Sequence, residues 1–269
     1  MIFACWGLAG TGKSTVGLTF PEPIWIADFD LRLGNKEEGG ALVRFPNLQY
    51  EAIKYPLPLQ LLSDQVTGVR ELWQRFLQDY VAVLEDKKLY NKIPFATIMI
   101  DTATKMRRAA NEMTLQVKQE AQIARGVTPE HELFRERLLE IEYGEPNTKL
   151  QSIIQAPVQY GKNLVLIHHA DDEYKKQLVT DKAGNQKIES VATGNKVMDG
   201  FKRTTEAADI VMKIYKEEVV EVVNGSKKTR KVFRGIVTKS GLHAQLEDMM
   251  FDDPSYEQIM AALKMLRGE

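Results

Sequence analysis

The first fourteen residues hold the feature that most constrains the fold of this chain. A short apolar run, Met1 to Trp6, leads directly into Gly7, and Gly12-Lys13-Ser14 follow after four more residues. This is the G-x-x-x-x-G-K-[ST] phosphate loop, which requires a strand before it and a helix after it, here over Thr15–Thr19. Glycine at both ends lets the backbone bend so that consecutive N–H groups point at phosphate oxygens. The spacing therefore predicts a nucleotide site.

The chemistry of the loop assigns a role to its residues. Lys13 is predicted to reach the β- and γ-phosphates, and the Ser14 hydroxyl is predicted to ligate Mg²⁺. ATP and Mg²⁺ are therefore the expected cofactors. The residues expected to bind the nucleotide are Gly7, Leu8, Ala9, Gly10, Thr11, Gly12, Lys13, Ser14 and Thr15.

A second nucleotide motif lies near residue 100. Phe95–Asp101 reads as a mostly apolar strand that ends in an aspartate, which is the Walker B pattern. We expect Asp101 to hold the Mg²⁺ water shell opposite Ser14. AAA+ ATPases usually carry their catalytic glutamate directly after this aspartate, but residue 102 is a threonine. The carboxylate that activates water must then come from elsewhere in the chain.

The best candidate for that carboxylate follows the strand Ile24–Ala27, which ends in Asp28-Phe29-Asp30. We expect this strand to lie beside the phosphate-loop strand, with its end at the carboxyl edge where ligands bind in open α/β sheets. Asp30, or else Asp28, would then position water or metal. The alternative is a turn aspartate that opens the next loop.

Two adjacent histidines end the continuous apolar strand Asn163–His169. A run this apolar indicates a strand covered on both faces. Successive side chains of a strand point to opposite faces, so only His168 or His169 can face the γ-phosphate as a sensor. A hydrogen-bonded pair at a strand end is the alternative.

Residues 171–203 are polar, and basic residues outnumber acidic ones after Asp172. Two interpretations stay open, a mobile polar loop that binds a partner beside the γ-phosphate and a solvated hairpin. The candidate nucleic-acid contacts in this stretch are Lys175, Lys176, Lys182, Lys187, Lys202 and Arg203.

Periodicity predicts the remaining elements. Helices are expected around residues 72–84 with an aromatic stripe in the core, and over 103–124, Glu130–Tyr143, Gln151–Tyr160 and Tyr256–Leu266. Strands are expected over 207–214 and 236–241, and between them a hairpin from Val219 to Phe233 that turns at Asn224-Gly225. On the last strand, Lys239 is either a finger that reaches a neighbouring subunit's nucleotide or an ordinary surface lysine.

Composition narrows the class of protein. The formal net charge of −1 argues against a basic coat for nucleic acid over the whole surface. The single cysteine, Cys5, predicts a small buried side chain and a reducing compartment. No apolar run is long enough for a transmembrane helix, and the first strand begins at residue 1, so we expect a cytoplasmic protein without a leader or a preceding domain.

The order of the motifs resembles that of phage-encoded RecA-like ATPases, short single-domain proteins implicated in single-strand annealing and recombination. After the phosphate loop come Ile-Trp-Ile-Ala-Asp-Phe-Asp, Thr-Ile-Met-Ile-Asp-Thr, Leu-Val-Leu-Ile-His-His-Ala-Asp-Asp-Glu-Tyr, Ala-Ala-Asp-Ile-Val-Met, and Val-Thr-Lys-Ser-Gly before Asp-Pro-Ser-Tyr. The resemblance covers nearly the whole chain.

This resemblance implies an α/β fold over residues 1–269, with a RecA-like P-loop NTPase core. Its mainly parallel sheet would be flanked by helices and followed by a C-terminal β-hairpin and a helix over 254–267. It implies ATP hydrolysis at sites between subunits, with Asp30 where the family places a glutamate, a histidine as the sensor and Lys239 as the finger. The implied partners are single-stranded DNA, further copies of the chain in a ring or filament, and a single-strand-binding protein in the host cytoplasm.

Two other functions remain compatible with the residues. One is a small-molecule kinase, which would act as a monomer or dimer and ignore DNA. The other is a nucleotide switch that binds ATP, hardly hydrolyses it and presents residues 171–203 to a protein partner.

Overall fold

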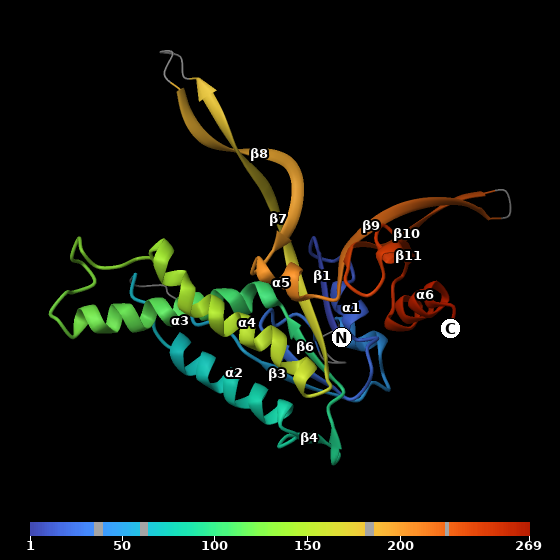
Figure 1. Cartoon of the computed structure of the whole chain (residues 1–269), viewed down its shortest axis with the longest axis horizontal. Coiled ribbons are helices and arrows are strands. Elements are labelled where there is room, and N and C mark those ends of the chain that lie inside the picture. Colours follow the sequence, from blue (N-terminus) through green and yellow to red (C-terminus); the bar gives the residue numbers. More distant parts are fainter. Residues whose placement is uncertain (35–39, 60–63, 181–185, 224–225) are drawn as a thin grey trace.

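The computed structural model describes residues 1–34, 40–59, 64–180, 186–223 and 226–269 (Figure 1). Among them, nine strands form one sheet in the order β11-β10-β9-β1-β7-β6-β2-β3, with β8 paired to β7. These strands are β1 (Ile2–Gly7), β2 (Ile24–Asp28), β3 (Tyr50–Lys54), β6 (Thr97–Asp101), β7 (Asn163–Thr180), β8 (Gln186–Asp199), β9 (Ile210–Val223), β10 (Ser226–Ser240) and β11 (Met250–Asp252). A separate small hairpin pairs β4 (Leu89–Tyr90) with β5 (Ile93–Pro94).

Helices cover both faces of the sheet. The α-helices of the described residues are α1 (Lys13–Gly17), α2 (Val69–Leu84), α3 (Ala103–Ile123), α4 (Gly144–Gln159), α5 (Arg203–Ala207) and α6 (Tyr256–Arg267). Short 3₁₀ turns lie at η1 (Ala41–Arg44), η2 (Glu140–Tyr143) and η3 (Ala244–Leu246). None of the helices in the described ranges is both long enough and apolar enough to cross a membrane.

The central strands pair in parallel, from β9 through β1, β7, β6 and β2 to β3. All residues of β1, β2 and β6 are buried, as expected for apolar strands that are covered on both faces. Alternate residues of β1 serve the two sides. Ile2, Ala4 and Trp6 pack in the cluster that includes α2, α3 and α4, whereas Phe3 and Cys5 pack with α1 and α6.

The aromatic stripe predicted for α2 lies in the core. Phe76 and Tyr80 are buried, and their rings pack against Trp25 of β2. Burial of one large apolar side chain contributes about 1.5–3 kcal/mol, so this cluster fixes α2 firmly on the sheet.

The predicted neighbour of the phosphate-loop strand is wrong. β2 does not lie beside β1, because β7 and β6 stand between them in the sheet. The strand that pairs with β1 on this side is β7, in a register that sets Gly7 opposite His169. The histidine strand, rather than the aspartate strand, is therefore the immediate neighbour of the phosphate loop.

The helix predicted for Glu130–Tyr143 is also wrong. The stretch is irregular until η2, and its apolar residues Leu133 and Ile141 remain 66% and 86% exposed, so they offer no core-facing stripe. Gly144 and Pro146, which directly follow this stretch, lie in the first turn of α4. Proline suits that position because the first turn leaves N–H groups unpaired in any case.

The described part of residues 171–203 is mostly a hairpin. β7 continues past His169 to Thr180 and pairs antiparallel with β8, with one irregularity after Asp172. Similarly, β9 runs on to Val223 without a break and pairs with β10 from Val223↔Ser226 onward. The predicted turn at Asn224-Gly225 and the candidate contact Lys182 lie outside the described residues.

Two long arms therefore leave the body of the molecule (Figure 1). We call residues 170–180 with 186–199 the β7–β8 arm, and residues 215–223 with 226–234 the β9–β10 arm. Each is rooted in a strand that flanks β1, β7 on one side and β9 on the other. Both arms therefore begin close to the phosphate loop.

Candidate nucleotide site

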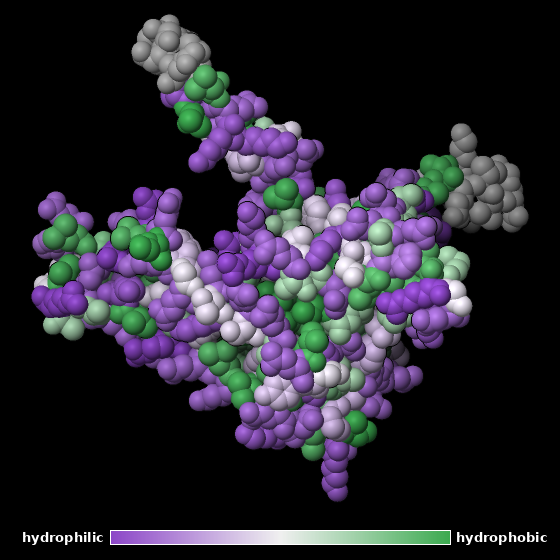
Figure 2. Space-filling view, viewed as in Figure 1, coloured by the Kyte–Doolittle hydropathy of each residue, from purple (hydrophilic) through white to green (hydrophobic). Residues whose placement is uncertain are grey.

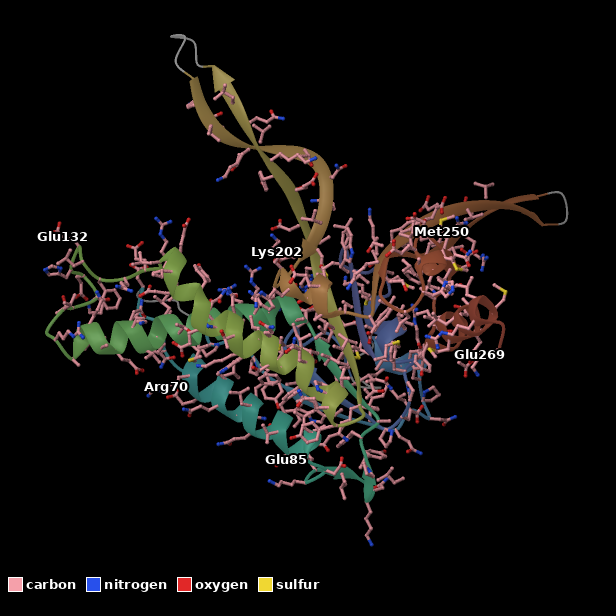
Figure 3. The ribbon with its side chains drawn as sticks, in the orientation of Figure 1. Arg70, Glu85, Glu132, Lys202, Met250 and Glu269 are labelled. Atoms are coloured by element: carbon pink, nitrogen blue, oxygen red, sulfur yellow. The ribbon has the colours of Figure 1, made fainter. Side chains whose placement is uncertain are left out.

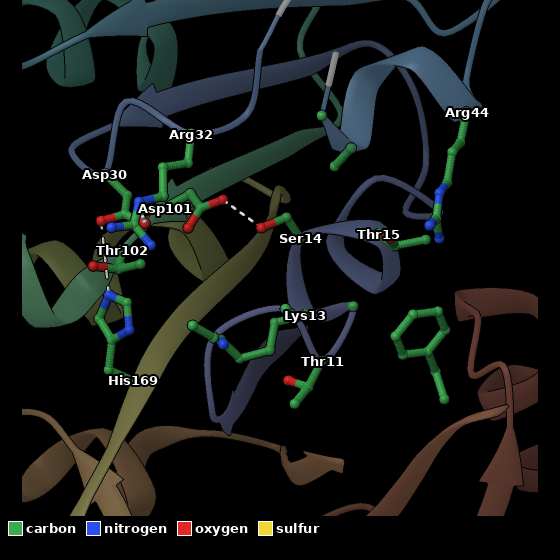
Figure 4. A pocket seen from close by; sticks show the side chains of 16 residues that line it. Thr11, Lys13, Ser14, Thr15, Asp30, Arg32, Arg44, Asp101, Thr102 and His169 are labelled. Carbon is green, nitrogen blue, oxygen red and sulfur yellow. Dashed lines mark hydrogen bonds and ion pairs between the residues drawn. The ribbon is translucent and has the colours of Figure 1, made fainter. Parts of the chain in front are cut away.

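A cavity of about 430 Å³ opens at the carboxyl edge of the parallel strands (Figure 4). Its lining residues come from the phosphate loop, from the ends of β2, β6 and β7, and from η1 and β10, and they are Ala9, Gly10, Thr11, Gly12, Lys13, Ser14, Thr15, Asp30, Arg32, Gly40, Ala41, Arg44, Asp101, Thr102, His169 and Phe233. The loop residues predicted to bind a nucleotide thus surround one space, except for Gly7 and Leu8, which are not part of this lining.

Gly7 is required by a close approach of the backbone. A Cβ atom at this position would lie 2.1 Å from the carbonyl oxygen of Ile214 on β9. Gly12 has a left-handed φ of 87°, and its Cβ would come within 3.2 Å of the Phe233 ring. Both glycines of the motif thus allow contacts that any larger residue would disturb.

The Lys13 side chain is held inside the loop. Its Nζ donates hydrogen bonds to the carbonyl oxygens of Gly7 at 3.0 Å and Leu8 at 2.7 Å. Burial lowers the pKa of Lys13, and neither acceptor carries a charge. Phosphate oxygens are stronger acceptors for an ammonium group because they are anionic. Lys13 is therefore placed to exchange carbonyls for phosphate.

Ser14 and Asp101 meet as the two motifs predict. The Ser14 hydroxyl donates to Oδ2 of Asp101 at 2.6 Å (Figure 4). Burial, together with repulsion from Asp28 and Asp30, raises the pKa of Asp101 to about 7. A divalent cation here would favour the ionised carboxylate.

The donor atoms fit Mg²⁺. A hydroxyl and a carboxylate supply only oxygen, and Mg²⁺ commonly takes one or two protein ligands and completes its octahedron with phosphate and water oxygens. Within the described ranges, no group of three or more His, Cys, Asp or Glu side chains is arranged to hold a metal by itself. Ser14 and Asp101 would accordingly hold Mg²⁺ together with the nucleotide.

Asp30 reaches the cavity although two strands, β7 and β6, separate β2 from β1. The amides of Phe29 and Asp30 donate to the carbonyl oxygen of Asp101 at 2.6 and 3.0 Å, which folds the turn over the end of β6. The Asp30 carboxylate then lies 2.6 Å from Nζ of Lys105 and 3.8 Å from Nε2 of His169. A carboxylate held from two sides at the cavity wall is in position to orient water.

Asp28, the other candidate, serves the turn. It is buried, it does not line the cavity, and its Oδ1 accepts the amide of Leu31 at 2.7 Å. This is the local side-chain-to-backbone bond typical of an aspartate that opens a loop.

The side chains of the two histidines point to opposite faces of β7, as expected for neighbouring residues of a strand. His169 lines the cavity, whereas His168 is buried and does not. Nδ1 of His168 lies 3.1 Å from the carbonyl oxygen of Asp199, so Nδ1 carries the proton in this contact. Burial lowers the pKa of His168 to about 4, which keeps its ring neutral. The sensor candidate is therefore His169.

The comparison with known proteins decides the class of this site. A family model described as an AAA domain matches residues 1–244. The chain belongs to the AAA domain family. No curated protein matched it in a sequence search. The AAA domain family indicates a P-loop ATPase that binds a nucleotide.

Several residues of the AAA domain's site were missed by sequence reasoning. Lys105 lies in the first turn of α3, where the side chain of Thr102 caps the helix by accepting the amide of Lys105 at 3.3 Å. Lys105 follows the Walker B residue Asp101 by four positions, and this closeness in sequence could have indicated that Lys105 belongs to the site. Arg32 follows Asp30 and approaches it to 3.7 Å. Arg44 and Phe233 carry no motif, because η1 and β10 meet the loop only in the folded chain.

Lys239 has a structural role within its own subunit. Its Nζ donates to the carbonyl oxygens of Thr205, Glu206 and Ala208 at 2.7, 3.0 and 2.7 Å, which satisfies the end of α5. It does not line the cavity of this AAA domain. Its predicted function as a finger for a neighbouring subunit stays a prediction.

The candidate nucleic-acid contacts fall in two places. Lys175, Lys176 and Lys187 are exposed on the β7–β8 arm. Lys202 lies where the arm rejoins the body (Figure 3). The adjacent Arg203 donates to Gln151 at 2.6 Å. The fold therefore separates these residues along the arm rather than gathering them into one patch.

Proposed function

We propose that this AAA domain is a RecA-like ATPase that binds single-stranded DNA through its β7–β8 arm and acts as an oligomer in recombination or annealing, with residues 1–269 as one unit. One observation carries the proposal. His169 at the nucleotide cavity and two lysines of the arm, Lys175 and Lys176, belong to the same strand, β7. A change at the phosphates therefore has a direct route to the proposed DNA-binding surface.

In the nucleotide site each residue has a stated task. Lys13 binds the β- and γ-phosphates, while Ser14 and Asp101 hold Mg²⁺, which neutralises phosphate charge. Asp30 orients the attacking water, and Lys105 positions the Asp30 carboxylate at 2.6 Å. Burial lowers the pKa of His169, so a neutral imidazole senses the γ-phosphate through a hydrogen bond.

The root of the arm is tied to the helix that follows the Walker B strand. The His169 amide donates to the Thr104 hydroxyl at 3.1 Å, and that hydroxyl donates to the carbonyl oxygen of Asp199 at 2.5 Å. Thr104 of α3 thus contacts both strands of the arm at its base. A shift of His169 toward the γ-phosphate would move this junction and, with it, the arm.

The arm offers two kinds of contact to single-stranded DNA. Tyr174 is 60% exposed and shares a face of β7 with Lys176, because the two are two residues apart. An aromatic ring supports stacking of a base, and a nearby ammonium supports contact with the backbone phosphate. Lys175 and Lys187 lie on the opposite face, where their carboxylate neighbours Glu173 and Glu189 approach them to 3.9 and 2.7 Å.

DNA binding can be tested on the full chain with a labelled single strand and a non-hydrolysable ATP analogue. We expect Tyr174→Ala and Lys176→Ala to weaken binding, and added salt to weaken it less in Lys176→Ala, because one phosphate contact has been removed. Tyr160→Ala, directly after α4, is the matched aromatic control. Binding that is unchanged in both arm variants would contradict this surface.

Oligomerisation is tested by gel filtration with and without ATP. The proposal expects rings or filaments in the presence of ATP, whereas a small-molecule kinase would remain a monomer or dimer. Engagement of Lys239 as a finger requires its release from the three carbonyl oxygens at the end of α5 and just after it, so Lys239→Ala should reduce hydrolysis only in the assembled form.

A second function is favoured by the outer part of the β7–β8 arm. Leu178 and Ile188 face each other in the register and are 63% and 70% exposed. Figure 2 shows hydrophobic atoms near the outer end of this otherwise hydrophilic arm. Exposed apolar side chains at this place suit a protein partner, as in a nucleotide switch that hardly hydrolyses ATP.

A further inference from the structure

A second cavity of about 230 Å³ adjoins the nucleotide cavity. The two share Gly12, Thr15, Arg44 and Phe233 in their linings. The second cavity continues between α1 and the turn before α6, where its lining residues are Val16, Thr19, Asp253, Pro254 and Ser255.

The second cavity lies on the side of the phosphate loop away from the proposed chemistry. In Figure 4, Asp30, Asp101 and His169 stand on one side of Lys13 and Ser14, and Thr15 and Arg44 stand on the other. The γ-phosphate is expected beside Asp101 and His169. The α-phosphate and the nucleoside must then extend past Thr15, in the direction of the second cavity.

Flat and apolar groups form the entrance to this cavity. The Arg44 guanidinium lies 5.7 Å from the centre of the Phe233 ring, and the Lys216 ammonium lies 5.6 Å from it. Phe233 is half-buried and its ring rests against Gly12 of the loop. Arg44 is exposed, so its side chain is free to move and admit a ring.

The floor of the cavity is fixed by hydrogen bonds. The Asp253 amide donates to the carbonyl oxygen of Phe233 at 2.7 Å. This bond connects β10, at the base of the β9–β10 arm, to the turn before α6. The Thr19 hydroxyl accepts the Tyr256 amide at 2.8 Å and donates to the carbonyl oxygen of Val16 at 2.7 Å. The space is thus preformed, with buried Val16 and Pro254 as its apolar wall.

We propose that Phe233 and Arg44 form the subsite for the nucleobase, which stacks on the Phe233 ring beneath the Arg44 guanidinium. Aromatic rings and guanidinium planes are the common stacking partners of bases in proteins. The proposal rests on nucleotide binding at the phosphate loop and not on DNA binding. Because Phe233 is part of β10, the base also contacts the root of the β9–β10 arm, so this arm senses whether a nucleoside is bound.

Calorimetry with two ligands separates the base from the phosphates. Affinities for Mg·ATP and for inorganic tripolyphosphate with Mg²⁺ are measured for the full chain, for Phe233→Ala and for Arg44→Ala. A lost base stack should weaken ATP binding roughly 5- to 150-fold, whereas tripolyphosphate binding should stay as in the unchanged chain. Phe233→Trp should retain ATP affinity because it keeps an aromatic face.

Tyr160→Ala, an aromatic truncation directly after α4 and outside both cavities, is the matched control and should change neither affinity. Unchanged ATP affinity in Phe233→Ala would overturn the proposal. An equal loss of affinity for ATP and for tripolyphosphate would also overturn it. Tripolyphosphate also reports whether each variant is folded. A chain that does not bind DNA would still show weakened ATP binding and unchanged tripolyphosphate binding in Phe233→Ala. Failure of the proposed DNA-binding function is therefore distinguishable from failure of the proposed nucleobase subsite.

Discussion

One residue step along β7 separates two histidines with different chemistry. His169 faces the nucleotide cavity, whereas His168 points into the packed side of the sheet, where a Cβ on Gly200 would come within 2.4 Å of its ring. Alternation along the strand was predictable from the sequence. Which of the two faces the cavity was not, because that depends on the register of β7 against β1.

His168 should make stability depend on pH. Its folded pKa of about 4 lies below the ordinary value of 6.5, because burial disfavours the charged ring and His169 and Arg107 repel it. The unfolded chain therefore binds the extra proton first as pH falls, so stability is lost between pH 6.5 and pH 4. We expect a loss of about 2 kcal/mol between roughly pH 7 and 5, measured by urea denaturation.

His168→Asn removes the titrating ring and leaves an amide to donate to the Asp199 carbonyl. Its unfolding free energy should fall less over the same pH range. If the variant and the unchanged chain show the same slope, another group is responsible for the pH dependence.

Asp30 should act in the chemical step. Asp30→Asn keeps the size of the side chain but removes the charge that orients water and pairs with Lys105. We expect kcat for ATP hydrolysis to fall by about 10²-fold or more while the dissociation constant for Mg·ATP changes little. A kcat within a few-fold of the unchanged chain would reduce Asp30 to a turn residue.

At the scale of elements, local patterns predicted the buried strands well and the length of β7 poorly. The apolar runs of β1, β2, β6 and β7 identify strands covered on both faces. The sequence does not show that β7 continues to Thr180, because its polar half has no core face and pairs only with β8. The predicted position of β2 beside β1 was wrong for a related reason, because the local sequence of a strand does not determine which strands become its neighbours in the sheet.

Nucleotide binding should change the protection of the β7–β8 arm. Peptides from residues 170–180 and 186–199 should exchange amide hydrogens at different rates with and without a non-hydrolysable ATP analogue, because His169 links the cavity to the root of the arm. In His169→Ala this difference should shrink, although the analogue still binds. An arm that responds equally in both proteins would show that the link runs elsewhere.

At the scale of the whole molecule, the two arms differ in charge. The chain carries a formal net charge of −1, and both arms project from the edge that holds the nucleotide cavity (Figure 1). The described β9–β10 arm has six basic and three acidic residues, whereas the described β7–β8 arm has four lysines and five acidic residues. The phosphate loop and the Walker B aspartate were predictable because their chemistry is local in sequence. Lys105, Arg44 and Phe233 join the site only through the topology of the sheet, and sequence patterns alone did not assign them.

The central claim is that ATP hydrolysis at the phosphate loop is linked to single-stranded DNA on the arm. The most direct measurement is steady-state ATP hydrolysis with and without single-stranded DNA, at low and moderate salt, beside Lys13→Ala. We predict hydrolysis that rises with DNA, weakens with added salt and is lost in Lys13→Ala. Hydrolysis that depends on Lys13 but ignores DNA at low salt would contradict the claim and favour the protein-partner switch.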